Sequence, residues 1–215
     1  MTIAVNSLRF FNPYEEILFT ENLLPHWQQK GSTYFITFRL ADSIPTRLRT
    51  RWEEERQVWL RFHPEPWNTE TEQEYHKRFT SAIECWLDAG YGSCVLRQVD
   101  CARIVNNALR HFDRQRLALI SSVVMPNHVH ALLIQNADHP LEHLLHSWKT
   151  FSSRNINRLV GRSGTLWQRS YFDRLVRDEK HFRNCVRYIR RNPEKAHLKP
   201  GEYILYESDM AKQIE

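Results

Sequence analysis

The chain has 215 residues, a length at which one domain, or one domain with a large insertion, buries a core of its own. Hydrophobic residues make up 41% and charged residues 26% of the sequence, which excludes fibrous, collagenous and fully disordered chains. No apolar run approaches the roughly 18 residues of a membrane span. Residues 1–16 lack the basic stretch and apolar core of a secretory signal, so we expect a cytoplasmic protein.

Positive charge is concentrated in one part of the chain. The formal net charge is +5, but residues 1–100 carry 11 basic and 14 acidic side chains, whereas residues 148–199 carry 14 basic and 4 acidic ones. Arginine supplies 23 of the 30 cationic residues, and its planar guanidinium suits bidentate phosphate contacts and stacking on bases. This distribution favours a nucleic-acid partner over a merely solvated basic surface.

The four cysteines have no C-x-x-C spacing; they are Cys85, Cys94, Cys101 and Cys185. No secretory signal is expected before them. We therefore expect reduced thiols rather than a disulfide scaffold or a cysteine zinc knuckle.

The first half of the chain predicts an irregular arm, one strand and three helices. Residues 1–32 contain Pro and Gly without a sustained period. Residues 33–40, TYFITFRL, are aromatic and β-branched and predict the first strand. Apolar residues at helical spacing then predict helices over 47–62, 72–89 and 101–114.

The second half predicts alternating strands and helices. Strands are expected over 117–125 and 128–135, and their short connection requires antiparallel neighbours. Amphipathic spacing predicts a long helix over 140–159, period-two alternation a strand over 167–176, and a final helix over 179–192 that stops at Pro193.

This order of elements indicates an α+β domain, an antiparallel β-sheet with helices packed on one face. A helical insertion is expected at about residues 45–115, between the first and second strands. We assign residues 33–198 to one domain, with an N-terminal arm over 1–32 and a C-terminal tail over 199–215.

Two histidines stand two residues apart in the strand predicted over 128–135. Because side chains alternate across a strand, His128 and His130 share one face and Val129 takes the other. Two neighbouring imidazoles can hold one cation, although paired histidines on a sheet are more often structural. The apolar residues around them predict a buried strand pair, where two imidazoles require a reason.

Tyr188 and Asn192 lie four residues apart in the last predicted helix, hence on one face. Pro193 places Asn192 near the helix end, where its amide can reach a ligand. A tyrosine on an amphipathic helix is usually a core-edge residue. Here a hydroxyl nucleophile and an amide oxygen lie beside Arg187, Arg190 and Arg191, which favours a role in chemistry.

A rival metal site is formed by His139, His143 and His146. Their spacing of four and three residues would place them on one helix face, where they could bind zinc. The same helix also carries a leucine and tryptophan stripe for packing, so the three histidines can instead be solvated.

Three sequence blocks resemble one family, the REP-associated tyrosine transposases of the HUH superfamily of single-strand endonucleases, which are related to insertion-sequence single-strand transposases. The blocks are MPNHVHALL (125–133), LWQRSYFDRLVRD (166–178) and YIRRNPEKAHL (188–198). Residues 87–113 also look like longer members of that family. One departure is His197–Leu198, where relatives commonly have Gly–Leu.

The resemblance implies a ferredoxin-like HUH endonuclease core. It implies that His128, His130 and Asn192 bind Mg²⁺ or Mn²⁺ and that Tyr188 is the nucleophile. The implied activity is cleavage of single-stranded, REP-type hairpin DNA through a 5′-phosphotyrosine intermediate, with rejoining left open. It further implies a bacterial cytoplasmic protein associated with the nucleoid, with DNA rather than a membrane as partner, as a monomer or a homodimer.

The basic segment supplies the candidate DNA contacts, which are Arg154, Arg158, Trp167, Arg169, Arg174 and Arg190. Trp148, Tyr171 and above all Trp167, which lies beside two polar residues, are candidates for stacking on bases, although such aromatic residues more often belong to the core. Two alternatives remain open. The chain could bind hairpin DNA as a regulator without cleaving it, or act as a zinc hydrolase through the three rival histidines.

Overall fold

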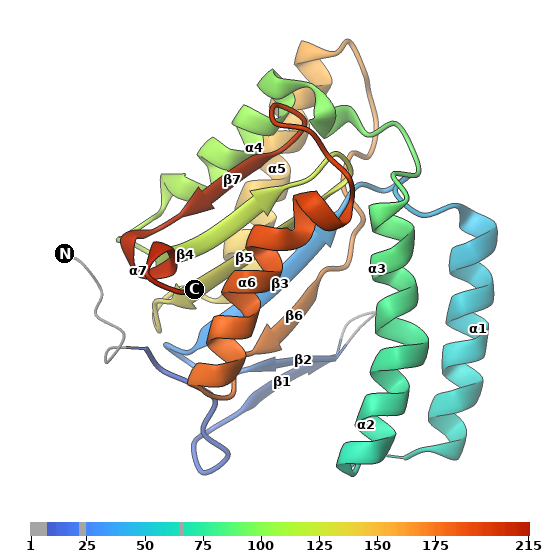
Figure 1. Ribbon diagram of the computed structural model, residues 1–215, viewed down its shortest axis with the longest axis vertical. Coiled ribbons are helices and arrows are strands. Elements are labelled where there is room, and N and C mark those ends of the chain that lie inside the picture. The colour runs from blue at the N-terminus through green and yellow to red at the C-terminus, as the bar shows by residue number, and fades with distance from the viewer. Residues whose placement is uncertain (1–7, 22–24, 65–66) are drawn as a thin grey trace.

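The computed structural model describes residues 8–21, 25–64 and 67–215. Its centre is a five-stranded antiparallel sheet with the strand order β6-β3-β5-β4-β7 (Figure 1). The strands are β3 Thr33–Arg39, β4 Leu117–Val124, β5 His128–Gln135, β6 Phe172–Leu175 and β7 Ile204–Glu207. The central strand, β5, is buried at all but one of its residues, because strands lie on both sides of it and helices cover both of its faces.

Seven α-helices belong to the described part of the chain. They are α1 Thr46–Phe62, α2 Thr69–Tyr75, α3 Ser81–Asp88, α4 Val99–His111, α5 Leu141–Leu159, α6 Glu179–Lys195 and α7 Asp209–Lys212. None of these helices has the length and apolarity that a membrane crossing requires.

Helices cover both faces of the sheet (Figure 1). Val129, Ala131 and Leu133 of β5 pack in one core with residues of α4 and α5, and Leu132 packs in a second core with α6 and α7. The predicted α+β class with an antiparallel sheet is confirmed. The expectation that helices cover one face only is wrong, because successive apolar residues of β5 point to opposite faces and each face needs its own cover.

The chain between β3 and β4 is helical and has an aromatic core of its own. A π-helical turn over His76–Thr80 separates α2 from α3, so the helix predicted over 72–89 is interrupted. The Trp59 ring packs against Trp67 and Phe79 with centroid distances of 5.2 and 5.8 Å. Helices α1, α2 and α3 of this segment lie to one side of the sheet (Figure 1).

Helix α6 continues past the residue at which it was expected to stop. Pro193 lies inside its last turn and the helix ends at Lys195. Proline removes one backbone N–H, but the Ala196 N–H still donates to the Asn192 carbonyl at 3.0 Å and the Leu198 N–H to the Pro193 carbonyl at 2.9 Å. The prediction that Pro193 ends the helix is therefore wrong by one turn.

Two short strand pairings were not expected. β1 (Leu18–Glu21) pairs with β2 (Pro25–Gln28) inside the predicted N-terminal arm, and β7 pairs with the edge of β4. Each of these strands is four residues long, too short for its sequence to establish a period. Residues 1–7 and 22–24 of the arm lie outside the described residues.

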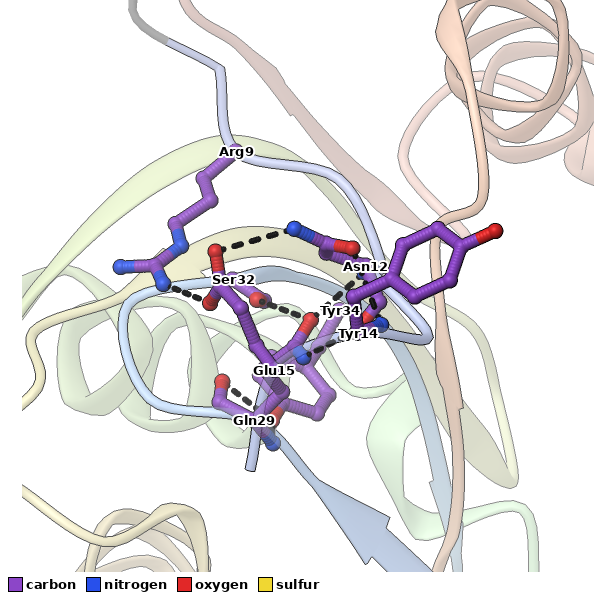
Figure 2. Close-up of polar contacts among 7 residues, drawn as sticks. All are labelled: Arg9, Asn12, Tyr14, Glu15, Gln29, Ser32 and Tyr34. Atoms are coloured by element: carbon purple, nitrogen blue, oxygen red, sulfur yellow. Dashed lines mark hydrogen bonds and ion pairs between the residues drawn. The ribbon is translucent and has the colours of Figure 1, made fainter. Parts of the chain in front are cut away.

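Buried polar contacts attach the N-terminal segment to β3 (Figure 2). The Asn12 N–H donates to Gln29 Oε1 at 2.9 Å, and Gln29 Nε2 donates to the Asn12 carbonyl at 2.8 Å. The Tyr34 hydroxyl accepts from the Gln29 N–H at 2.6 Å and donates to the Gln29 carbonyl at 2.9 Å. Burial raises the pKa of Tyr34 to about 12, so the hydroxyl keeps its proton and both bonds at neutral pH.

Replacing Tyr34 by Phe removes both bonds and leaves two buried backbone groups of Gln29 without this partner. We expect the free energy of unfolding to fall by about 1–3 kcal/mol, measured by urea denaturation. Tyr14→Phe is the matched control, because the Tyr14 side chain is 95% exposed. Equal stability of the two variants would contradict the anchoring role of Tyr34.

Candidate metal and nucleophile site

Four polar residues from β5 and α6 meet between the sheet and α6, and we call them the histidine–tyrosine cluster: His128, His130, Tyr188 and Asn192. The two imidazole Nε2 atoms lie 3.0 Å apart, and the histidines are only 1% and 3% exposed. The Tyr188 ring centroid lies 5.2 Å from that of His130. The fold thus brings together side chains that are about sixty positions apart in the chain.

Asn127 determines which nitrogen of His128 carries the proton. Its Nδ2 donates to the carbonyls of Leu87 and Tyr91 at 3.2 and 3.3 Å, so its Oδ1 is the atom that faces His128 Nδ1, at 2.8 Å. An amide oxygen only accepts, and therefore His128 Nδ1 donates. The Nε2 lone pair of His128 is then directed at His130 and is available to a cation.

His130 completes the arrangement through Thr37, its direct neighbour across β3 and β5. With the Nε2 of His128 as acceptor, His130 donates from its own Nε2, and its Nδ1 accepts from the Thr37 hydroxyl at 2.7 Å. A hydroxyl both donates and accepts. His130 can therefore move its proton to Nδ1 and present a second lone pair to the same cation.

The histidines are neutral at physiological pH. Burial lowers the pKa of His128 to about 3, against a smaller opposing effect of the Asn192 amide. Burial, followed by the neighbouring His128, also lowers the pKa of His130 well below its usual value. Neutral imidazole is the form that binds metals, so neither ligand needs to lose a charge first.

Asn192 is the unsatisfied member of the cluster. It is 1% exposed, and although it lies close enough to His128 and Tyr188 to influence the pKa of both, neither of its amide atoms forms a well-oriented hydrogen bond. A buried amide without partners is costly and calls for a ligand or a role. A divalent cation held by the two imidazoles would give the amide oxygen a partner.

The donor set therefore fits the cation that the resemblance implies. Two imidazole nitrogens and an amide oxygen leave positions for water and phosphate oxygens, which suits Mn²⁺ and, less well, Mg²⁺. In the part of the chain that the structure describes, no three His, Cys, Asp or Glu side chains come together at a metal site. Asn192 would take the place that a carboxylate or third histidine has in other sites.

Tyr188 is held by aromatic and charged neighbours. Phe35 packs edge-on against Tyr188 and stacks on His130, with centroid distances of 5.6 and 5.5 Å. Burial, then the carboxylates of Glu84 and Asp88, raise the pKa of Tyr188 above its usual value. The phenol is therefore neutral at physiological pH.

Sequence reasoning missed the residues that orient the cluster. Asn127 directly precedes the two histidines, and its position in the connection between the strands is the one signal that was available. Thr37 and Phe35 lie in another strand, and only the register of β3 against β5 places them beside His130. Glu84 and Asp88 belong to the helical insertion, and no local sequence pattern predicts how that insertion packs against α6.

The rival zinc site is not formed. His139 precedes α5, which begins at Leu141 with Pro140 as its cap, so the three histidines do not share a helix face. The side chains of His143 and His146 are exposed, and no metal cluster includes them within the described residues. The proline at the helix start is the physical reason that the predicted spacing failed.

Trp167 belongs to the core rather than to a DNA surface. It is 4% exposed, its ring meets Phe38 at 4.9 Å, and its Nε1 donates to Ser152 Oγ at 2.9 Å. Trp148 is buried as well. The expectation that Trp167 stacks on a base is wrong, because both the ring and its one polar atom already have partners.

Arg190 holds the C-terminal segment. Its guanidinium lies 2.9 Å from the Glu207 carboxylate and donates to the carbonyls of Ile214 and Ala211. The predicted DNA contact by Arg190 is therefore not supported, because these acceptors occupy its donors.

The other arginines differ in their position relative to the histidines. Arg154 and Arg158 are exposed on α5, which packs on the opposite face of the sheet from the histidine–tyrosine cluster. Arg169 is exposed in the segment before β6. Arg174 is the register partner of Phe35, so its side chain starts from the same face as His130.

The depressed histidine pKa values make the stability of the metal-free protein depend on pH. Below the usual histidine pKa of 6.5 the unfolded chain binds protons that the folded chain excludes, so the free energy of unfolding falls from about pH 6.5 toward pH 3. At pH 5 we expect a loss of about 2 kcal/mol from His128 relative to pH 7, and a further loss from His130. Urea denaturation without divalent cations measures this loss of unfolding free energy.

The double variant H128Q/H130Q should lose this part of the pH dependence. H143Q, whose side chain is exposed, should keep it in full. Identical pH dependence in the wild type and the double variant would contradict the burial of two neutral imidazoles.

The family model described as "Transposase IS200 like" matches residues 95–192, which include the whole histidine–tyrosine cluster. None of the curated proteins compared with the chain matches it. A solved REP-associated tyrosine transposase bound to a REP hairpin is 15% identical, with 86% of this chain and 90% of that chain covered and a TM-score of 0.44. A transposase from Deinococcus radiodurans R1 is 16% identical, with 86% and 98% covered and a TM-score of 0.35. Residues 95–192 of this chain are therefore similar to the IS200-like transposases.

Proposed function

We propose that this protein is an IS200-like transposase and a metal-dependent single-stranded DNA endonuclease in which Tyr188 is the nucleophile. His128, His130 and Asn192 would hold the cation, Mg²⁺ or Mn²⁺. One observation carries the proposal: a phenol, two neutral imidazoles and a buried amide without a well-oriented hydrogen bond meet at one point. A purely structural cluster would not leave the Asn192 amide unsatisfied.

The reaction we propose is transesterification at one phosphate of the strand. The bound cation supplies orientation of the scissile phosphate and neutralisation of the charge that develops on it. Tyr188 attacks phosphorus, becomes joined to the 5′ phosphate and releases a 3′ hydroxyl. Because one phosphodiester replaces another, a 3′ hydroxyl can later attack the phosphotyrosine and rejoin a strand without ATP. Phe35, which packs against both Tyr188 and His130, would hold the phenol ring beside the histidine.

The substrate we propose is a DNA hairpin of the REP type with a single-stranded flank. The resemblance of three sequence blocks to REP-associated tyrosine transposases supports this choice, as does the net charge of +10 from 14 basic and 4 acidic residues over 148–199. Arg174, on the same face as His130, is the arginine best placed to contact the strand near the cluster. Arg169 is exposed nearby in the chain and is a second candidate.

Tyr188→Phe removes the nucleophilic oxygen and keeps the ring. We expect it to abolish the covalent protein–DNA adduct formed with a 3′-labelled REP-type hairpin in Mn²⁺, while DNA affinity changes less than about twofold. Denaturing electrophoresis detects the adduct and fluorescence anisotropy the affinity. Continued cleavage by Tyr188→Phe would show that another group is the nucleophile.

The same assay distinguishes the proposed nuclease from a regulator that binds hairpin DNA without cutting it. A folded wild-type protein that binds the hairpin but forms no adduct in Mn²⁺ would support the regulator. The intact cluster favours the nuclease, because a binding protein has no need for two buried imidazoles and an unsatisfied amide around a tyrosine.

Asn127→Ala removes the acceptor that fixes the His128 tautomer while leaving all three proposed ligands in place. We expect Mn²⁺ affinity to fall by about 10–100-fold, as for other residues that orient histidine ligands. Electron paramagnetic resonance of free Mn²⁺ measures this on DNA-free protein. H143A is the control and should bind Mn²⁺ as the wild type does; unchanged affinity in Asn127→Ala would contradict the orienting role.

A further inference from the structure

The helical insertion brings charged side chains to the rim of the histidine–tyrosine cluster. Glu84 and Asp88 lie one turn apart on α3, and Tyr188 and Lys195 lie two turns apart on one face of α6. The C-terminal ends of these two helices lie beside one another (Figure 1), and an ion pair connects them. Two carboxylates of the insertion therefore face the helix that carries the phenol.

Distances distinguish the roles of the two carboxylates. Lys195 Nζ lies 2.9 Å from Asp88 Oδ2 and 3.8 Å from Glu84 Oε2, and 6.0 Å from the centre of the Tyr188 ring. Asp88 is the closer partner of the lysine. Glu84 keeps acceptor capacity and stands next to the same tyrosine.

The environment of Tyr188 supports this placement. Burial is the main cause of its raised pKa, followed by the charges of Glu84 and Asp88 and by a hydrogen bond to Glu84. A neutral phenol is a weak nucleophile and needs a proton acceptor as the new bond forms. His130 also faces the phenol, but its Nε2 is directed at His128, and Lys195 is a cation. Of the described groups around the phenol, Glu84 is thus the acceptor best placed for its proton.

We propose that Glu84 is the general base for Tyr188, a role that rests on the proposed function of Tyr188 as nucleophile. As the bond from Tyr188 Oη to phosphorus forms, the phenol proton passes to the Glu84 carboxylate. The bond from phosphorus to the 3′ oxygen breaks, and that oxygen takes a proton from water. In rejoining, the attacking 3′ hydroxyl gives its proton to water and Glu84 returns its own to Tyr188 Oη. The Asp88–Lys195 ion pair positions α3 against α6.

Glu84 and Asp88 lie outside residues 95–192, the part of the chain that the transposase family model matches. The insertion therefore adds a catalytic group to the site. The developing O–P bond makes the phenol far more acidic than it is at rest, which is why a carboxylate suffices as its acceptor.

The test compares three variants at saturating hairpin DNA in Mn²⁺, with the single-turnover rate of adduct formation as the readout. E84Q keeps the size and hydrogen-bonding ability of the side chain but cannot take a proton, and we expect its rate to fall by about a hundredfold. E84D keeps a carboxylate and should be faster than E84Q. E54Q, an exposed position on α1, is the matched control and should cleave at the wild-type rate.

DNA affinity and Mn²⁺ affinity separate this role from a structural one. Both should stay within about twofold of the wild type in E84Q, because the base touches neither the strand's phosphates nor the proposed ligands. Wild-type cleavage by E84Q, or a parallel loss of either affinity, would overturn the inference while leaving Tyr188 as the nucleophile. No adduct from the wild-type protein would overturn the proposed function, and the inference with it.

Discussion

The Asn127 side chain connects three parts of the molecule. Its Nδ2 is bound to the end of α3 through Leu87 and to the following turn through Tyr91, and its Oδ1 is bound to His128. Because Asn127 is buried, none of these bonds is exchanged for water. The insertion, the connection between β4 and β5 and the histidine tautomer are therefore determined together, and the remaining geometry of the site depends on that choice.

Burying the polar groups of this site lowers the stability of the fold, whereas the function proposed for the site requires their burial. Two imidazoles on the central strand lose their hydration and resist protonation, and the Asn192 amide forms no well-oriented hydrogen bond. These costs are concentrated around Tyr188, while the opposite face of the same strand is apolar and packs against α4 and α5. Such a division is typical of a protein in which one core stabilises the fold and the other holds a reactive group.

Local sequence patterns predicted the elements whose hydrophobic periodicity extends over many residues. They failed for features that depend on contacts with other segments of the chain. Strand β5 begins and ends where its sequence indicates, and the face shared by His128 and His130 follows from alternation alone. Trp167 was misassigned because its neighbours Gln168 and Arg169 are polar, yet its ring fills a space beside Phe38. The zinc site predicted from His139, His143 and His146 does not form, because Pro140 separates His139 from the helix that carries the other two histidines. Strand β7 has four residues, and only its pairing with β4 defines it.

The sequence by itself determined the α+β class, the histidine pair on one strand face, the tyrosine and asparagine one turn apart and the basic segment around them, because each of these depends on spacing within one element. Tertiary structure alone decided that both pairs meet, that Thr37 and Asn127 orient the imidazoles, and that Glu84 and Asp88 reach the tyrosine helix. These contacts join residues from separate elements. They depend on strand register and helix packing, which arise because both apolar faces of the sheet are buried at once. No pattern among residues adjacent in the sequence reports this packing.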